Sequence, residues 1–405
     1  MFERYSLLEN ARLSDADTPP PECADALRPE ECAAALKEIE QWSGYRPTPL
    51  RTLPGMARAL GVGELLYKDE SDRFGLGSFK ALGGAYAVHR YLARELADRG
   101  VAASLSVSEL VTGKYADVVS TLTVTCATDG NHGRSVAWGA KMFGCACVVF
   151  IHAHVSRARE EAIVSYGARV VRITGNYDDS LQRAAEDAGT HNWHVISDTS
   201  YPGYTTVPRE VMAGYTVMVD EAIRALPAAQ PPTHVFAQGG VGGLAAAVCA
   251  PVWWKYGASR LQLFIVEPEN AACLYASAAA GKRVHVGGSL DTVMAGLSCG
   301  EPSLIAWPLL SAGTHYFMCI DDDAALATMR RVAEGESGDT PVVGGESGVA
   351  GLAGLLALCN DREAARRLHL DRHARVLVFG TEGDTDAELY TRIVGESGDQ
   401  VRARQ

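Results

Sequence analysis

One stretch decides the fold: Asp72-Arg-Phe-Gly-Leu-Gly-Ser-Phe-Lys-Ala-Leu-Gly-Gly-Ala-Tyr86. It places Lys80 after a glycine-punctuated loop and just before a helix that we expect to open at Gly83. Ser78 is a suitable N-cap for that helix, which puts Lys80 in its first turn. Because the positive end of a helix disfavours an ammonium group, we expect the amine of Lys80 to be closer to its neutral, nucleophilic form. A lone lysine after a turn is more often simply solvated, so the interpretation depends on the rest of the chain.

Composition and charge exclude several classes of protein. The chain has 405 residues, a net charge of −12, 47% hydrophobic and 21% charged residues. These values are typical of a globular protein long enough for two domains. The negative charge argues against nucleic acid as a partner. The sequence contains no uncharged apolar run of about 18 residues, so it predicts no membrane span. Its first residues do not show the pattern of a secretory signal. We therefore expect a cytoplasmic protein that binds neither nucleic acid nor membranes.

The ten cysteines do not form a metal-binding pattern. Cys145 and Cys147 are a close pair, but neither a second pair nor suitably spaced histidines accompany them. We therefore predict buried thiols and no metal site. Cys273 and Cys299 flank a glycine-rich region, and a contact between them is a second hypothesis, although disulfides are uncommon in the cytoplasm.

Short apolar segments alternate with helical ones along most of the chain, which predicts parallel sheets covered by helices. The fold class is therefore α/β, with a smaller α/β domain, residues 96–205, inserted into a larger one formed by residues 1–95 and 206–405. Residues 101–123 lack a clear period and are expected to be a connector. The expected strands are residues 65–70, 122–127, 147–151, 169–173, 193–197, 234–237, 261–266 and 376–379. The expected helices are residues 29–42, 83–99, 134–143, 157–166, 178–188, 210–225 and 244–252.

Two turns between strands and helices are rich in glycine. Thr128-Asp-Gly-Asn-His-Gly133 precedes a helix that we expect to start near Arg134, and backbone amides at such a turn bind a carboxylate well. Gln238-Gly-Gly-Val-Gly-Gly243 also opens a helix, and its glycines allow the close approach of a phosphate. The second turn is neither the dinucleotide-binding fingerprint nor a Walker loop. Each turn taken alone is equally typical of an ordinary strand–helix connection.

The order of these motifs resembles a known superfamily. Ser78-Phe-Lys80, the Gly-Asn-His turn, the glycine loop and Thr381 after the last strand are similar to the motifs of the fold type II pyridoxal-phosphate enzymes, which include serine/threonine dehydratase and tryptophan synthase β. The resemblance spans about residues 45–386 and implies pyridoxal 5′-phosphate as the cofactor. The cofactor-binding residues that it implies are Phe79, Lys80, Asn131, Gly239, Gly240, Val241, Gly242, Gly243 and Thr381.

The resemblance also implies what these residues do. Lys80 carries the cofactor, Asn131 contacts its ring oxygen O3′, and the glycine loop cradles its phosphate. Thr381 hydrogen-bonds the pyridine nitrogen, and such a neutral partner leaves that nitrogen largely unprotonated, which favours elimination reactions. Glu382 follows directly, and a carboxylate at that position complicates the assignment.

Asp129 narrows the resemblance. Serine and threonine dehydratases usually carry a small neutral residue here, whereas Asp-Gly-Asn-His-Gly resembles the diaminopropionate ammonia-lyases. Gly175-Asn-Tyr-Asp-Asp-Ser180 and Ser197-Asp-Thr-Ser-Tyr-Pro-Gly-Tyr204 are also similar to segments of that family. Helix capping explains the acidic residues of the first segment equally well, and an Asx-turn is the common role of an Asp-Thr pair. The resemblance implies Lys80, Asp129 and Asp198 as catalytic residues, and Thr128, Gly130, His132 and Tyr177 as substrate-binding residues.

The implied activity is the elimination of ammonia from D- and L-2,3-diaminopropionate to give pyruvate, carried out by a homodimer. Asp129 would take the α-proton of one enantiomer and Lys80 that of the other, while Asp198 would hold the cationic β-amino group. Two alternatives within enzymes are a serine/threonine dehydratase and a synthase that performs β-replacement on a related amino acid. A third alternative is a pyridoxal-phosphate-binding protein without turnover, against which the joint presence of the three catalytic residues argues.

Overall fold

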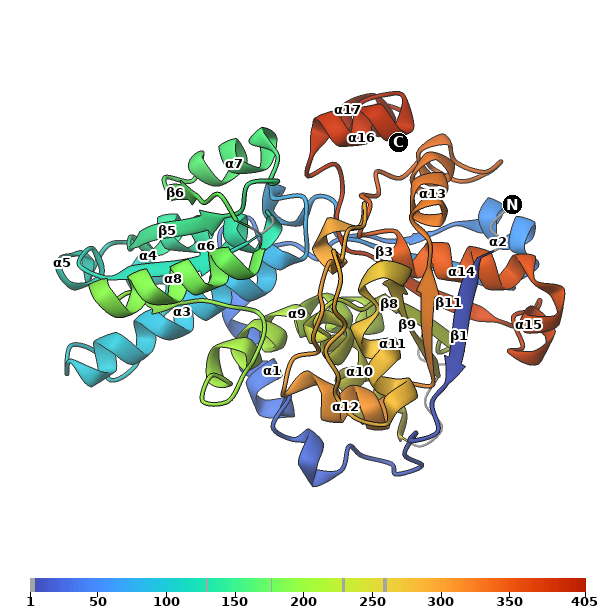
Figure 1. Ribbon diagram of the computed structural model, residues 1–405, viewed down its shortest axis with the longest axis horizontal. Helices are drawn as coiled ribbons and strands as arrows, with labels where there is room; N and C mark the ends of the chain where they lie inside the picture. The colour runs from blue at the N-terminus through green and yellow to red at the C-terminus, as the bar shows by residue number, and fades with distance from the viewer. Residues whose placement is uncertain (1–3, 129, 176, 228–229, 258–260) are drawn as a thin grey trace. The chain divides into compact units, whose positions relative to one another are not determined.

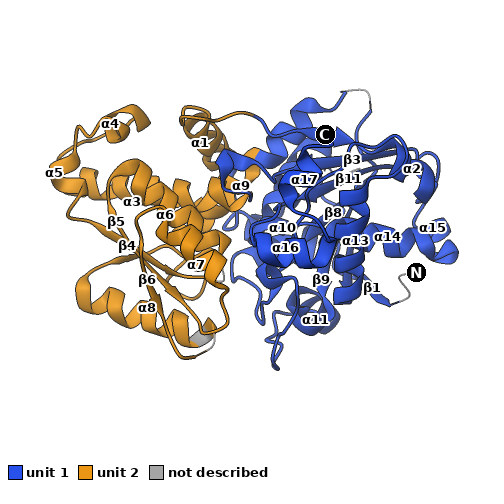
Figure 2. Ribbon diagram, turned by 90° about the horizontal axis from the view of Figure 1, so that it is seen from above, with its two compact units in different colours: residues 1–28, 47–78, 218–405 blue, residues 29–46, 79–217 orange. Residues whose placement is uncertain are grey.

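The chain forms two compact α/β units (Figures 1 and 2). The computed structural model describes residues 4–128, 130–175, 177–227, 230–257 and 261–405. Unit 1 consists of residues 1–28, 47–78 and 218–405, and unit 2 consists of residues 29–46 and 79–217. The predicted α/β class is confirmed.

Unit 1 is built on a seven-stranded sheet with the strand order β1-β10-β9-β8-β11-β3-β2. The strands from β10 to β3 run parallel, whereas β1 and β2 pair antiparallel with the outermost of them. The strands are β1 (Tyr5–Glu9), β2 (Leu50–Thr52), β3 (Glu64–Asp69), β8 (His234–Gln238), β9 (Gln262–Pro268), β10 (Tyr316–Ile320) and β11 (Arg375–Gly380). Nearly continuous burial along β8, β9 and β11 fits parallel strands that are covered on both faces.

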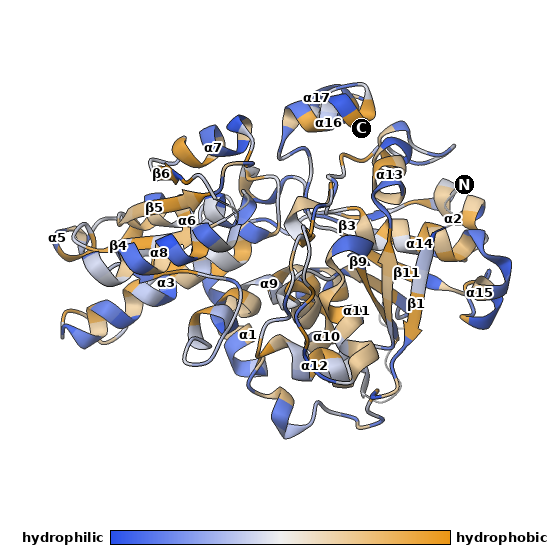
Figure 3. Cartoon of the chain, viewed as in Figure 1, coloured by the Kyte–Doolittle hydropathy of each residue, from blue (hydrophilic) through white to orange (hydrophobic). Residues whose placement is uncertain are grey.

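Helices rich in alanine, leucine and glycine cover this sheet. Helix α14 packs across β8, β9, β10 and β11, and α10 packs against β8. The approach of α14 is close, because a Cβ atom at Gly354 would lie 2.8 Å from the side chain of Val266. Figure 3 shows α10 and β11 in apolar colours and α15 as mostly hydrophilic. The helices of unit 1 are α2 (Pro54–Leu60), α10 (Gly243–Tyr256), α11 (Cys273–Ala280), α12 (Ala306–Gly313), α13 (Asp322–Glu334), α14 (Ala350–Asn360), α15 (Arg362–Arg367), α16 (Ala387–Val394) and α17 (Gly398–Arg402).

Unit 2 contains a four-stranded parallel sheet with the order β6-β5-β4-β7. Its strands are β4 (Thr123–Ala127), β5 (Ala146–Ile151), β6 (Arg169–Arg172) and β7 (His194–Val195). Its helices are α1 (Pro29–Ile39), α3 (Lys80–Asp98), α4 (Val107–Val111), α5 (Ala116–Val119), α6 (Asn131–Phe143), α7 (Arg157–Val164) and α8 (Tyr177–His191). Helix α9 (Thr206–Ala225) begins in unit 2 and ends in unit 1. Among all the helices described, none has the length and apolar character that a membrane span needs.

Residues at the start of α3 belong to unit 2 because α3 packs closely on α6. A Cβ atom at Gly139 of α6 would lie 2.7 Å from the Cα atom of Ala85 in α3. The hydroxyl of Ser135 in α6 also donates a hydrogen bond of 2.6 Å to the carbonyl of Lys80. Residues 79–95, which the sequence assigned to the larger domain, therefore group with unit 2.

The bounds of the two units differ from the predicted domains at other points as well. Residues 29–46 and 206–217 join unit 2, although the sequence placed both in the larger domain. Trp42 shows the reason, because its ring packs edge-on against those of Trp138 and Phe143 in α6, with centroids 5.8 and 5.9 Å away. The insertion of one folded domain into another stays a prediction.

All eight predicted strands are present, and each of their ends lies within two residues of the prediction. Three strands were missed: β1, β2 and β10. β2 has three residues, and both β1 and β2 are edge strands whose formation depends on a distant partner. Three helix starts were placed three or four residues too late, since α3 begins at Lys80, α6 at Asn131 and α9 at Thr206. The N-cap of α3 is Phe79, without a side-chain cap, so the prediction of Ser78 as N-cap is wrong. The expected connector contains α4 and α5.

We predict that Gly139→Ala destabilises the protein by about 1–3 kcal/mol, because the added methyl group overlaps the backbone of α3. The measurement is the urea midpoint of the cofactor-free protein. Gly189→Ala in α8 is the matched control, because no atom lies within 4 Å of the added carbon. Removing a glycine from a helix interior should raise stability there by about 0.5–1 kcal/mol. Equal effects of the two substitutions would contradict the packing argument.

Candidate active site

Phe79 and Lys80 lie at the start of α3, whereas the other described site residues that were predicted in unit 2 follow the carboxyl ends of its parallel strands. Thr128, Gly130 and His132 come after β4, Tyr177 opens α8 after β6, and Asp198 follows β7. Because carboxyl ends of parallel strands meet at one edge of a sheet, these residues share that edge, where α/β proteins place their ligands. Asp129 lies outside the described residues.

Lys80 forms an ion pair with Asp198. Their side chains are 20% and 17% exposed. Burial works against the charge on Lys80, but the carboxylate of Asp198 outweighs it and raises the pKa of Lys80 above its ordinary value. Burial likewise favours the neutral acid of Asp198, yet the nearby ammonium holds the pKa of Asp198 below its usual range. The expectation that the helix end would favour a neutral Lys80 is therefore wrong for the unmodified amine, because the adjacent carboxylate dominates.

Two aromatic rings flank this lysine. The ring centres of Phe79 and Tyr215 are 4.6 Å apart, and the Nζ atom of Lys80 lies 5.4 and 5.5 Å from them. Both distances are within the range of a cation–π contact. Sequence reasoning missed Tyr215, which lies in α9. The only signal for it was Gly83, because a Cβ atom there would clash with the ring of Tyr215.

His132 is a second neighbour of Asp198. Its Nε2 atom is 2.8 Å from the carbonyl of Ile196, and its Nδ1 atom is 3.9 Å from the carboxylate of Asp198. Since a carbonyl only accepts, Nε2 carries a hydrogen. Burial lowers the pKa of His132, so the ring is neutral at pH 7 and its Nδ1 lone pair faces Asp198.

The turn after β4 is shaped by its own threonine. The Oγ1 atom of Thr128 accepts hydrogen bonds of 3.0 Å from the backbone N–H groups of Gly130 and Gly133. Gly130 has a φ of +151°, which favours glycine. Thr128 therefore contributes to the turn through its hydroxyl, and this turn leads directly into Asn131 at the start of α6.

The glycine loop of unit 1 has the properties of a phosphate cradle. Gly240 and Gly242 have φ values of +65° and +98°, and Gly242 is the N-cap of α10 without any side-chain cap. The first amides of α10 are therefore not capped by a side chain of the N-cap residue. A Cβ atom at Gly239 would clash with the side chain of Glu267. Glycines have no side chain of their own to cover the backbone amides, and such amides suit a dianion.

Thr381 lies beside this loop. It follows β11, and Gln238 ends the neighbouring strand β8. The Nε2 atom of Gln238 is 3.1 Å from the Oγ1 atom of Thr381. The sequence thus correctly predicted the glycine loop and Thr381 to follow strands, but it gave no role to Gln238.

Glu382 turns toward a loop that the sequence reasoning missed. Its Oε1 atom accepts a hydrogen bond of 2.9 Å from the backbone N–H of Ser347. A Cβ atom at Gly348 would lie 2.7 Å from the backbone nitrogen of Glu382. The available signal was Gly344-Gly-Glu-Ser-Gly348, a glycine-rich run just before α14. This hydrogen bond directs one oxygen of the Glu382 carboxylate to the loop.

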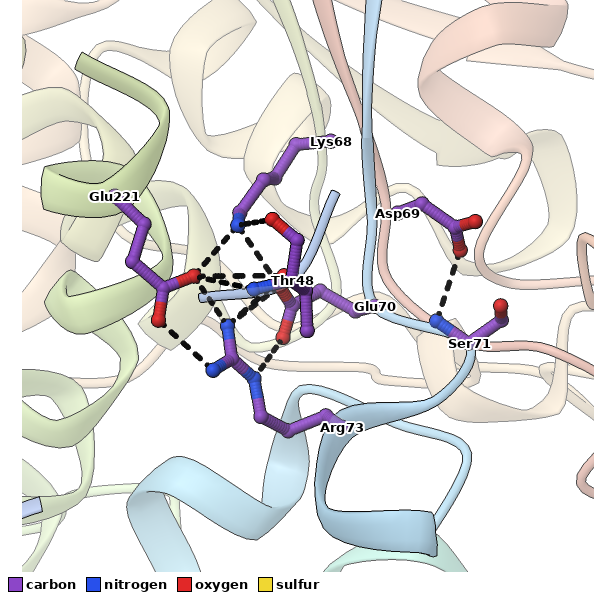
Figure 4. A network of polar contacts seen from close by, with 7 residues as sticks. All are labelled: Thr48, Lys68, Asp69, Glu70, Ser71, Arg73 and Glu221. Atoms are coloured by element: carbon purple, nitrogen blue, oxygen red, sulfur yellow. Dashed lines mark hydrogen bonds and ion pairs between the residues drawn. The ribbon is translucent and has the colours of Figure 1, made fainter. Parts of the chain in front are cut away.

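A buried cluster of four charges in unit 1 joins the chain segment that leads to Lys80 with Glu221 of α9 (Figure 4). Arg73 donates to both Glu70 and Glu221, with distances of 2.8 Å from Nε to Glu70 and 2.6 Å from Nη2 to Glu221. Lys68 lies 2.6 Å from Glu221. All four side chains are at most 3% exposed. Thr48 adds a hydrogen bond to Glu70.

The charges of this cluster neutralise one another. Burial would lower the pKa of Arg73, but Glu70 and Glu221 raise it above its ordinary value. Burial would raise the pKa of Glu221, but Arg73 and Lys68 lower it. The two basic and two acidic side chains pair in a dry environment, which makes each of them dependent on the others.

Comparison with known proteins gives the family. Residues 42–381 match the family described as pyridoxal-phosphate dependent enzyme. The diaminopropionate ammonia-lyase of Salmonella typhimurium (strain LT2) is 40% identical over 358 residues, which are 86% of this chain and 88% of that protein. This chain belongs to the diaminopropionate ammonia-lyase family.

The structure of the selenomethionine-containing holo enzyme from Escherichia coli has a TM-score of 0.88 and 34% identity over 97% of both chains. That of the Escherichia coli enzyme in complex with an aminoacrylate-PLP azomethine reaction intermediate has a TM-score of 0.85 and 33% identity over 99% of both chains.

The cofactor of this ammonia-lyase family member is pyridoxal phosphate, and the described residues fit it. Lys80 supplies a partly exposed amine. The glycine loop and the uncapped start of α10 supply amides for the phosphate, and Thr381 supplies a hydroxyl on the adjacent strand end.

We predict that Lys68→Met destabilises the protein by about 3–5 kcal/mol, because it leaves two buried carboxylates facing one cation. The double variant Lys68→Met/Glu221→Gln restores the charge balance, so its loss should be smaller than the sum of the two single losses. The readout is the urea midpoint of the cofactor-free protein. Arg157→Met removes an exposed pair with Glu161 and serves as a control that leaves the midpoint unchanged. Strict additivity of the two cluster substitutions would contradict the account.

Proposed function

We propose that this protein eliminates ammonia from both D- and L-2,3-diaminopropionate and releases pyruvate and two molecules of ammonia. The observation that carries the proposal is the ion pair of Lys80 with Asp198 in a chain of this family. When bound, pyridoxal phosphate acts as an electron sink that makes the α-hydrogen of an amino acid acidic. The protein then has to hold the cofactor, orient the substrate and accept the proton.

Asp198 suits a substrate with a second amino group. Its carboxylate is ionised and faces the ammonium of Lys80. When Lys80 carries the cofactor, Asp198 loses this partner, and the β-ammonium group of diaminopropionate is a cation of the same type. We therefore assign the binding of the β-amino group to Asp198, which makes the site selective for a diamine over serine.

Two bases are needed for two enantiomers, because the α-protons point to opposite faces of the cofactor ring. We assign one enantiomer to Asp129 and the other to Lys80. Neutral His132 sits beside Asp198 and, with the Thr128–Gly130 turn and Tyr177, is assigned to the substrate-binding side of the site. The cofactor contacts assigned here are those of Phe79, Asn131, Thr381 and the loop Gly239, Gly240, Val241, Gly242 and Gly243.

The assembly and location of the protein are further expectations. Dimers are the expectation for this family, and we propose the cytoplasm as the location. Light scattering on the purified holoenzyme tests the homodimer: a monomeric mass at working concentration would contradict it.

The direct test is pyruvate release by the purified holoenzyme from D-2,3-diaminopropionate, L-2,3-diaminopropionate and L-serine. We expect fast release from both diaminopropionate isomers and little from serine, because serine has no β-ammonium group for Asp198. Release from serine alone would make the protein a dehydratase. If the cofactor-loaded protein released no pyruvate from any of the three substrates, a β-replacement synthase or a non-catalytic binding protein would be favoured.

We predict that Asp129→Asn loses about 10²–10⁴-fold in turnover of one enantiomer, because a general base contributes that much, while turnover of the other enantiomer is largely kept. Asp198→Asn is the comparison variant and should impair both isomers, mainly through a higher KM. The measurement is steady-state pyruvate formation with each isomer. Equal losses for both isomers in Asp129→Asn would refute its assignment as the base for one enantiomer.

A further inference from the structure

The phenol of Tyr215 is a buried polar group near Lys80. The residue is 1% exposed, and its hydroxyl makes no hydrogen bond within the part of the chain that the structure describes. Burial raises the pKa of Tyr215 above its ordinary value, although the ammonium of Lys80 lowers it, so the phenol is neutral at pH 7. A buried hydroxyl without a hydrogen bond is unfavourable. Packing of the ring explains a phenylalanine at this position but not the hydroxyl of a tyrosine.

Two glycines bring this phenol to Lys80. A Cβ atom at Gly83 of α3 would lie 2.4 Å from the Cε1 atom of Tyr215. One at Gly214 of α9 would lie 2.4 Å from the carbonyl oxygen of Leu82. Because neither glycine has a side chain, α9 approaches the first turns of α3 closely. The Nζ atom of Lys80 consequently lies 5.5 Å from the centre of the Tyr215 ring.

The surroundings of Lys80 favour its charged form. Burial would lower the pKa of Lys80, but Asp198 and Tyr215 raise it. The faces of the Phe79 and Tyr215 rings also attract an ammonium group. Each of these interactions is weaker with a neutral amine.

This preference matters when Lys80 acts as a base. In the proposed function, Lys80 is a neutral amine before it takes the α-proton and an ammonium afterwards. An interaction that strengthens as this charge forms lowers the barrier of the step. Asp198 is then assigned to the β-ammonium group of the substrate. The hydroxyl oxygen of Tyr215 remains as an acceptor for an N–H group of Lys80.

We propose that Tyr215 is a positioning residue: its hydroxyl oxygen orients the freed amine of Lys80 and stabilises the ammonium that forms when Lys80 takes the α-proton. The proposal rests on the proposed function, in which Lys80 takes the proton of one enantiomer. In that step the C–H bond breaks, its electron pair stays with the substrate, and the proton bonds to the lone pair of Nζ. The other enantiomer is assigned to Asp129, so the hydroxyl of Tyr215 should matter mainly for one isomer.

The test compares Tyr215→Phe, which keeps the ring but lacks the hydroxyl, with wild-type holoenzyme on both isomers of 2,3-diaminopropionate. We expect kcat to fall about 10–100-fold for the isomer whose turnover Asp129→Asn keeps, because Lys80 takes that proton. The loss for the other isomer should be smaller, and KM should change little for either. The isotope effect of α-deuteration on kcat should rise for the affected isomer alone, because proton transfer becomes slower relative to the other steps.

Tyr91→Phe is the matched control. It removes a phenol hydroxyl from the helix that carries Lys80, but the ring of Tyr91 stacks on His194 at the start of β7, with centroids 3.9 Å apart. We expect neither kcat nor the isotope effect to change in this variant.

A second readout needs neither substrate nor cofactor. Acetylation of Lys80 by acetic anhydride in the cofactor-free protein, followed by mass spectrometry over pH, reports the pKa of its amine. The side chain of Lys80 is 20% exposed and therefore accessible. Without the hydroxyl the ammonium is less stable, so acetylation should begin at a lower pH in Tyr215→Phe than in wild type. Asp198 and His132 also face Lys80, and the variant retains both.

Equal losses for both isomers, an unchanged kcat for both, or an unmoved acetylation profile would overturn the proposal. Because the hydroxyl has no structural partner among the described residues, its removal should leave the melting temperature unchanged. A Tyr215→Phe protein that fails to fold would therefore overturn the proposal as well. Failure of the proposed function is a separate outcome, in which wild-type holoenzyme releases no pyruvate from either isomer. Acetylation of the cofactor-free protein still measures the effect of Tyr215 on Lys80 in that case.

Discussion

Mutual neutralisation of four buried charges is the constraint on which unit 1 depends. Lys68, Glu70, Arg73 and Glu221 come from β3, from the segment that follows it and from the end of α9, and none is more than 3% exposed. Each charge is tolerable only because the other three are in place. The cluster therefore fixes the course of the chain just before it reaches Lys80. A stable fold and the placement of the segment that leads to the lysine share the same physical cause.

Paired polar groups also determine the properties of the candidate residues in each unit. In unit 2, a buried carboxylate without a partner would be unfavourable. The ammonium of Lys80 stabilises the carboxylate of Asp198 by forming an ion pair with it. In unit 1, the N-cap residue of α10 supplies no side chain to its amides, and Thr381 supplies a hydroxyl at the end of the strand beside β8. Partly unsatisfied donors next to a glycine loop are what a phosphate and a ring nitrogen need. The proposed lyase chemistry follows from groups that the fold leaves available for a ligand.

The sequence predicted the elements that depend on local patterns. Apolar runs located eight strands, and glycine-rich turns after them located the loop at Gly239–Gly243 and the turn before Asn131. The features that it missed depend on contacts between distant residues. Strand β1 exists because it pairs with β10, and α3 starts at Lys80 although no side chain caps it. The unit bounds follow from the packing of α3 on α6, which depends on Gly139 meeting Ala85.

The same distinction applies to the site. Lys80, Asp198 and Thr381 were found because each stands in a recognisable segment. Tyr215 and Gln238 were missed because their roles come from α9 packing on α3 and from β8 lying beside β11. The raised pKa of Lys80 was missed for the same reason, since the sequence shows the helix end but not the carboxylate 118 residues away.

The most direct test of the account is to reduce the holoenzyme with borohydride, digest it, and locate the cofactor-labelled lysine by mass spectrometry. Reduction makes the link between the cofactor and its lysine permanent, so the labelled peptide identifies the residue. The account predicts the label on Lys80, with none when Lys80 is replaced by alanine. A label on Lys68 or on any other lysine of the wild-type protein would contradict the central claim that the site is organised around Lys80.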